Sequence, residues 1–158
     1  MADTVEFLDA TWPLLYVRFP REFSPAVMQA TIDAFERIYT RKERFVNLVD
    51  CSPIVKFPGM VERKMLSEWM ATPGRADKEK AFTVATAIVL RSGPMRAMMS
   101  AITWVSPPVS PQVWKATELE AFDWCYERLV EGRLPVTKAI EAARAEYRRN
   151  RPASQRVR

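Results

Sequence analysis

The sequence predicts an α/β domain with a mostly parallel sheet of four to five strands covered by helices. Two observations carry this prediction. First, short runs of branched and aromatic residues alternate along the chain with segments whose hydrophobic residues recur every three or four positions. Such alternation of strand and helix is typical of a parallel sheet. Second, the chain has 158 residues, 48% hydrophobic and 27% charged, which suits one soluble domain whose core needs no disulfide or metal.

Five segments are expected to be strands. Leu14–Phe19 and Phe45–Asp50 are short and apolar, and the near-continuous apolarity of the second is typical of a central parallel strand. Phe82–Leu90 is the longest such run. Gln112–Ala116 is expected to be a short last strand, and Val5–Leu8 a strand that precedes the others.

Helices are predicted between these strands from local start and stop signals. Ser24-Pro25 combines a capping hydroxyl with a proline suited to the first helical position. A second helix carries hydrophobic residues on one side from Met60 to Met70, and Ser92 can cap a third. Thr117 to Glu120 matches the capping box of a fourth helix, which is expected to end at Gly132.

The end of the chain differs from the rest in charge. The main domain is expected to span residues 1–132, followed by a C-terminal helix at 133–149 that starts at Pro135 and a disordered basic tail at 150–158. From residue 133 onward eight Lys and Arg stand against two Glu, whereas the whole chain has a net charge of +5. A basic tail on a neutral body predicts no DNA partner, and the tail is expected to contact anionic surfaces weakly.

Targeting signals are not expected in this sequence. The N-terminus has no cationic stretch followed by an apolar run, so no signal peptide is predicted. The longest nearly uncharged segment, Ala97–Lys115, contains prolines and polar residues, and it is not expected to span a bilayer as a regular helix. A cytoplasmic location is therefore predicted.

The composition excludes several chemistries. Because the chain has no histidine, no imidazole can activate a nucleophile or bind zinc. Its four glycines do not form a phosphate-binding loop. Cys51 and Cys125 lie far apart in apolar settings and are expected to be free thiols. The possible members of a hydrolase site at the end of the central strands are Asp50, Ser52 and Lys56. We expect neither an enzyme nor a cofactor or metal.

Three local patterns resemble the STAS-like group, that is, anti-sigma-factor antagonists and their STAS/SEC14-type bacterial relatives. The first is the strand Phe45–Asp50 followed by Cys-Ser-Pro. The second is the strand-to-helix junction from Ala85 to Arg96, and the third is the short strand and capped helix from Val113 to Leu129. The resemblance covers roughly Leu14 to Leu129. It implies an α/β regulatory or interaction domain, usually without catalytic activity.

The resemblance does not bring a phosphorylation site with it. In phosphorylated STAS domains an acidic turn with a serine opens the helix after the central strand. The corresponding turn here, Lys56 to Met60, keeps Gly59 but has neither the acid nor the serine. Asp50, Ser52, Lys56 and Gly59 are therefore expected at most to form a ligand-binding or switch turn.

Two functions remain open. The first is a non-enzymatic regulatory protein-interaction module that self-associates as a homodimer. The alternative is a small-ligand carrier of SEC14-like type, with a lipid or nucleotide between sheet and helices. An enclosed apolar cavity of roughly several hundred Å³ would favour the carrier, and a solid core with a flat exposed Met and Trp face would favour the module. The residues expected to bind the partner are Met65, Trp69, Met95, Met98, Met99, Ile102 and Trp104.

Overall fold

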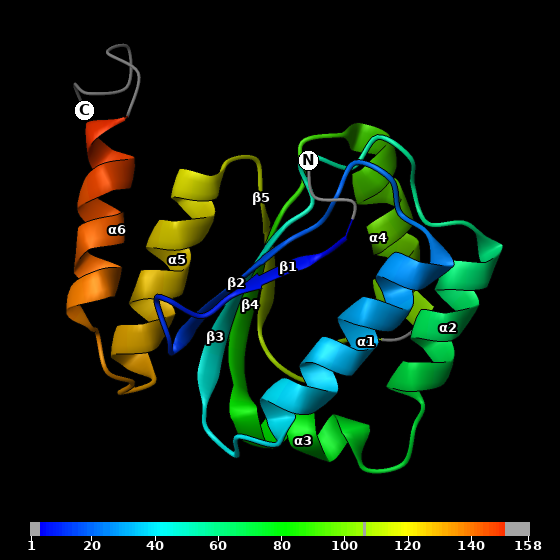
Figure 1. Ribbon diagram of the computed structural model, residues 1–158, viewed down its shortest axis with the longest axis horizontal. Helices are drawn as coiled ribbons and strands as arrows, with labels where there is room; N and C mark the ends of the chain where they lie inside the picture. The colour runs from blue at the N-terminus through cyan, green and yellow to red at the C-terminus, as the bar shows by residue number, and fades with distance from the viewer. Residues whose placement is uncertain (1–3, 106, 151–158) are drawn as a thin grey trace.

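A five-stranded sheet forms the centre of the protein (Figure 1). The computed structural model describes residues 4–105 and 107–150. The strands lie side by side in the order of the chain. They are β1 (Glu6–Leu8), β2 (Leu14–Arg18), β3 (Phe45–Asp50), β4 (Thr83–Val89) and β5 (Gln112–Lys115).

The sheet is mostly parallel, as predicted. β1 runs antiparallel to β2, and β2, β3, β4 and β5 are all parallel to their neighbours. β3 lies in the middle and all six of its residues are buried, in agreement with its apolar sequence. The α/β class and the mostly parallel sheet are therefore confirmed.

Helices cover both faces of the sheet, and one face carries more of them than the other. Because right-handed crossovers between parallel strands in chain order always step in the same direction, the helices they contain fall on one face. Figure 1 shows α1, α2, α3 and α4 on one side of the sheet and α5 and α6 on the other. The helices are α1 (Pro25–Tyr39), α2 (Met60–Met70), α3 (Arg75–Phe82), α4 (Gly93–Val105), α5 (Glu118–Glu131) and α6 (Lys138–Arg149).

The predicted capping residues begin their helices. The Ser24 hydroxyl accepts a hydrogen bond from the Val27 amide at 3.2 Å, and the Thr117 hydroxyl accepts one from the Glu120 amide at the same distance. The C-terminal helix differs from the prediction, because it starts at Lys138 and not at Pro135. The hydroxyl of Thr137 caps this helix, so the start of the helix is marked by the capping side chain and not by the proline two residues earlier.

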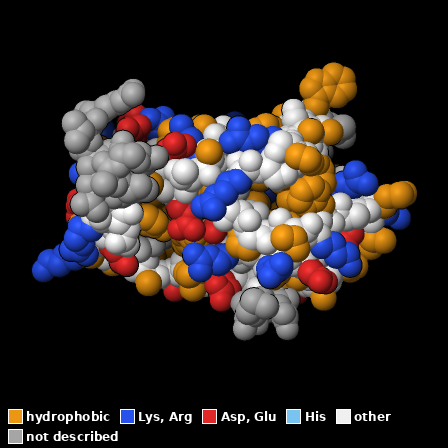
Figure 2. All heavy atoms as spheres, turned by 90° about the horizontal axis from the view of Figure 1, so that it is seen from above, with side chains coloured by type: hydrophobic (Ala, Val, Ile, Leu, Met, Phe, Trp, Pro, Cys, Tyr) orange, Lys and Arg blue, Asp and Glu red, His pale blue; other side chains and the backbone are white. Residues whose placement is uncertain are grey.

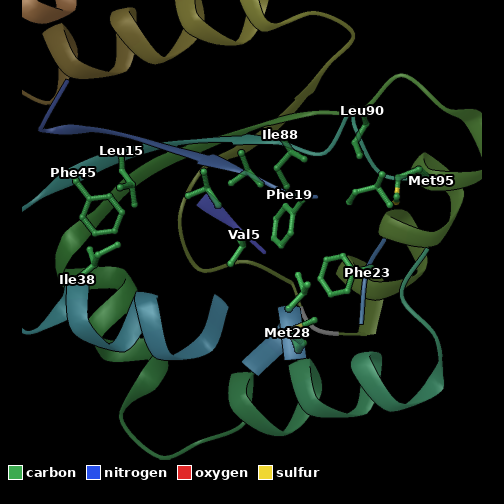
Figure 3. Close-up of a cluster of buried hydrophobic side chains, with 14 of the residues drawn as sticks. Val5, Leu15, Phe19, Phe23, Met28, Ile38, Phe45, Ile88, Leu90 and Met95 are labelled. Atoms are coloured by element: carbon green, nitrogen blue, oxygen red, sulfur yellow. The ribbon is translucent and has the colours of Figure 1, made fainter. Parts of the chain in front are cut away.

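Each face of the sheet has its own hydrophobic core. Between the sheet and α5 and α6, the small side chains of Ala85 and Ala87 allow α5 to approach closely, and Phe122 is buried there. The larger core lies under α1, α2 and α4 (Figure 3). Within the described part of the chain, no helix has the length and apolar character that crossing a membrane requires. The expected basic tail lies outside the described residues from position 151 onward.

Candidate functional site

A cavity of about 220 Å³ lies between the sheet and helices α1, α2 and α4. Its walls are mainly apolar. Figure 3 shows five residues that line the cavity and converge from β4, from helices α1 and α4, and from the segment between β2 and α1: Ile88, Met28, Met95, Phe19 and Phe23. Sites for small molecules are typically of this kind, concave and apolar with a few placed polar groups.

The sheet side of this cavity carries a row of polar side chains. Asn47 on β3 pairs in register with Thr86 on β4, and Thr86 pairs with Gln112 on β5. Paired residues of parallel strands face the same side of a sheet, and all three line the cavity. We call these three residues the polar row.

Asn47 is the most buried member of the polar row. Its exposed fraction is 4%, and its neighbours Val46 and Leu48 point into the opposite core. Its Oδ1 atom is buried and has no hydrogen-bond partner among the residues that the structure describes. A buried polar atom without a partner is uncommon in native proteins and costs stability.

A buried ion pair also borders the cavity. The Arg75 guanidinium pairs with the Glu79 carboxylate within α3, and it stacks on the Trp69 ring with 4.3 Å between guanidinium carbon and ring centroid. The Ser110 hydroxyl donates to the same carboxylate at 3.1 Å. These contacts neutralise the charge at this end of the cavity.

The turn after β3 is organised around Asp50, whose exposed fraction is 1%. Its carboxylate accepts hydrogen bonds from the Ser52 amide at 2.9 Å and from the Tyr16 hydroxyl at 3.2 Å, and Arg18 Nε lies 3.5 Å away. Burial, and next the Asp50 charge, raise the pKa of Tyr16 well above its usual range, so this hydroxyl stays protonated. These contacts occupy both carboxylate oxygens.

The other residues of the predicted turn do not join this group. Lys56 is exposed, and its backbone pairs with the segment that precedes α1. Gly59 caps α2, and its amide donates to the Glu62 carboxylate at 2.9 Å. The structure therefore brings Asp50 and Ser52 together and leaves Lys56 and Gly59 separate from them.

A cluster that the sequence did not reveal joins this turn to the far side of the sheet. Arg18 reaches from Asp50 toward the Glu118 carboxylate, which lies 3.7 Å from Arg18 Nη2. The Tyr147 hydroxyl of α6 donates to the same carboxylate at 3.0 Å. The cluster therefore consists of Arg18, Asp50, Glu118 and Tyr147. These residues lie up to 129 positions apart in the sequence, so no local pattern could show that they meet.

The cysteines lack the properties of nucleophiles. Burial, and next the Asp50 charge, raise the pKa of the half-buried Cys51 thiol to about 12. Burial also raises the pKa of Cys125 far above its usual range. Both thiols are free and protonated at neutral pH.

Most of the predicted partner-binding residues surround the cavity. Met95 is buried, and Trp69, Met98, Met99 and Ile102 are half-buried and line the cavity. Helical spacing placed these residues on one face, and that face is turned to the sheet. Of the remaining two predicted residues, Met65 packs on the same core and Trp104 is 89% exposed.

An exposed apolar group lies at the beginning of α2 and was not predicted. It consists of Val55, Met60 and Val61, and the exposed fraction of Met60 is 80%. Lys56 and Arg63 are exposed next to it in the chain. Figure 2, seen from above, shows hydrophobic side chains gathered on the half that carries α1, α2 and α4, with Lys and Arg side chains beside them.

The comparisons with known proteins give one likeness of fold. No family model matches the chain, and no curated protein matches it. Among solved structures, the chain is similar to an anti-sigma factor antagonist from Mycobacterium paratuberculosis, with 13% identity and a TM-score of 0.48 over 77% of this chain and 92% of the other.

Proposed function

We propose that this chain is a non-enzymatic domain that binds a small, mostly apolar molecule in the cavity between the sheet and helices α1, α2 and α4. The observation that carries the proposal is the apolar cavity with Asn47 on its wall, whose buried Oδ1 atom has no hydrogen-bond partner among the described residues. Of the two functions that the sequence left open, the carrier requires such a cavity. We propose no catalytic activity because the Cys51 thiol is protonated and both oxygens of the Asp50 carboxylate accept hydrogen bonds from the protein.

The size of the cavity limits the ligand. A cavity of about 150 Å³ lined by Leu, Ile and Phe binds benzene, whereas drug-sized molecules need about 300–1,000 Å³. At about 220 Å³ the cavity suits one aromatic ring with small substituents, or a short aliphatic chain. A phospholipid or a nucleotide would require the helices to move apart.

The proposal is tested by thermal unfolding in the presence of toluene. A ligand that binds only the folded state stabilises it by about 2.7 kcal/mol at a hundredfold excess over Kd, which corresponds to roughly 5–10 °C in Tm for a chain of this size. Met99→Trp should fill the cavity and abolish the shift, since Met99 lines it. Met60→Trp is the matched control, because Met60 is exposed, and it should keep the shift. An unchanged wild-type Tm, or a full shift in Met99→Trp, would contradict the proposal.

The protein-interaction module is the second candidate function. It is favoured by Val55, Met60 and Val61, three large apolar residues that are exposed within a short stretch of the chain, because exposed apolar surface that is contiguous marks interaction sites. We expect this group to form the interface of the predicted homodimer. Light scattering should then give twice the chain mass for the wild type and the chain mass for Met60→Lys. A wild-type monomer at high concentration would count against self-association.

A further inference from the structure

We infer that the ligand of the cavity carries one neutral hydroxyl group, which hydrogen-bonds to the polar row formed by Asn47, Thr86 and Gln112. The ligand class is thus a small phenol or alcohol of roughly one ring in size. This inference rests on the proposed function and adds to it the chemistry that the cavity recognises.

The polar row is placed by the sheet and not by flexible loops. Its members stand in register on β3, β4 and β5, and all three line the cavity. Adjacent strands lie about 4.8 Å apart, so the row extends over roughly 10 Å of the cavity wall. A single ligand hydroxyl seated over β4 is within reach of the side chains on both neighbouring strands.

The polar row contains one buried atom that lacks a hydrogen-bond partner in the described part of the chain. Within the described residues, the backbone carbonyl of Asn47 accepts a hydrogen bond from the Cys125 thiol at 3.8 Å, whereas the side-chain Oδ1 of Asn47 is buried without a partner. The Oδ1 atom of Asn47 is an acceptor that needs a donor. A hydroxyl both donates and accepts, and it therefore satisfies the carboxamide and the Thr86 hydroxyl together, whereas a ketone or ether offers no proton to Oδ1.

The charges around the cavity favour a neutral ligand. Arg75 is compensated by Glu79, which also accepts from Ser110, so this pair leaves no net charge for an anion to neutralise. The third charged residue that lines the cavity, Arg63, is exposed and its Nε donates to the Gly59 carbonyl at 3.2 Å. A carboxylate or phosphate buried beside the polar row would lose its hydration without gaining an opposite charge.

The test compares two probes of nearly equal shape, p-cresol and p-xylene, which differ by a hydroxyl in place of a methyl group. Binding to the full chain is measured by titration calorimetry or by ligand-observed NMR. We expect the wild type to bind p-cresol about tenfold more tightly than p-xylene. Asn47→Leu should remove this preference while binding p-xylene at least as well. Thr86→Val is the second variant, in case Asn47→Leu does not fold, and Met60→Leu is the control that should keep the preference.

The outcomes separate this inference from the proposed function. If p-xylene binds but the wild type does not prefer p-cresol, the hydroxyl inference fails and the cavity remains a binding site. The hydroxyl inference also fails if Asn47→Leu or Thr86→Val keeps the full preference, since the polar row would then not be the recognising group. If neither probe binds, the proposed function fails as well.

Discussion

Asn47→Leu is expected to make the unliganded protein more stable. The Asn47 side chain is 4% exposed, and its Oδ1 has no partner in the part of the chain that the structure describes. Burying a polar group without a hydrogen bond costs about 1–3 kcal/mol in protein variants, and leucine removes that cost with an apolar side chain of the same branching, whose extra volume extends into the adjoining cavity. We therefore expect the free energy of unfolding to rise by about 1–2 kcal/mol, and Tm by roughly 2–8 °C.

Urea unfolding followed by tryptophan fluorescence measures this change. The other asparagine of the chain, Asn150, is exposed at the end of α6, so Asn150→Leu is a control with the same substitution and an expected change within about 0.5 kcal/mol. A loss of more than about 1 kcal/mol in Asn47→Leu would contradict this expectation, because it would mean that the carboxamide is hydrogen-bonded in the folded protein. The gain in stability together with the loss of the preference for p-cresol over p-xylene would identify Asn47 as a residue kept for function at the expense of stability.

Three further outcomes follow from the buried and charged groups. Arg75→Met alone should lower the free energy of unfolding by about 3–5 kcal/mol, because it leaves the Glu79 carboxylate buried without its cation. Adding Glu79→Leu should restore most of that stability. If the two substitutions instead lower the stability additively, the ion pair does not contribute as expected. Cys51 should react with a thiol reagent at pH 8 roughly a thousandfold more slowly in the folded protein than in urea, because a thiol with a pKa of about 12 is almost never in its reactive thiolate form. Equal rates in the folded and unfolded protein would contradict the raised pKa. Hydrogen bonding from Lys78 lowers the pKa of Glu36 below 4.5, so its contribution to stability is present above that pH and lost as the pH falls through the lowered value. Urea midpoints should therefore fall less steeply with acid in Glu36→Gln than in the wild type, and parallel curves would exclude this contribution.

Local sequence signals were sufficient for the elements of the fold. The apolar run Phe45–Asp50 became the buried central strand, and Ser24 and Thr117 capped the helices that they were expected to cap. These features depend on neighbours a few residues away, which periodicity and capping rules describe. The start of α6 was displaced because the capping hydroxyl of Thr137 outweighed the proline signal at Pro135.

The cavity could not be predicted, because an unfilled volume depends on how several helices pack together. The spacing of Met95, Met98 and Ile102 defines one face of α4, but it does not say whether that face meets solvent or the sheet. The sequence does contain one signal for the site. Asn47 is the one uncharged polar residue within the apolar run Phe45–Asp50, and a lone carboxamide inside a buried strand needs either a protein partner or a ligand.

Native mass spectrometry of the full chain purified from its own host asks directly whether the cavity holds a small molecule. We expect a protein peak accompanied by a noncovalent adduct of low mass, which collisional activation releases as a neutral molecule and which p-cresol displaces. The same spectrum reports whether the chain is a monomer or a dimer. A spectrum with the bare chain alone, unchanged after p-cresol is added, would mean that the cavity is not a binding site.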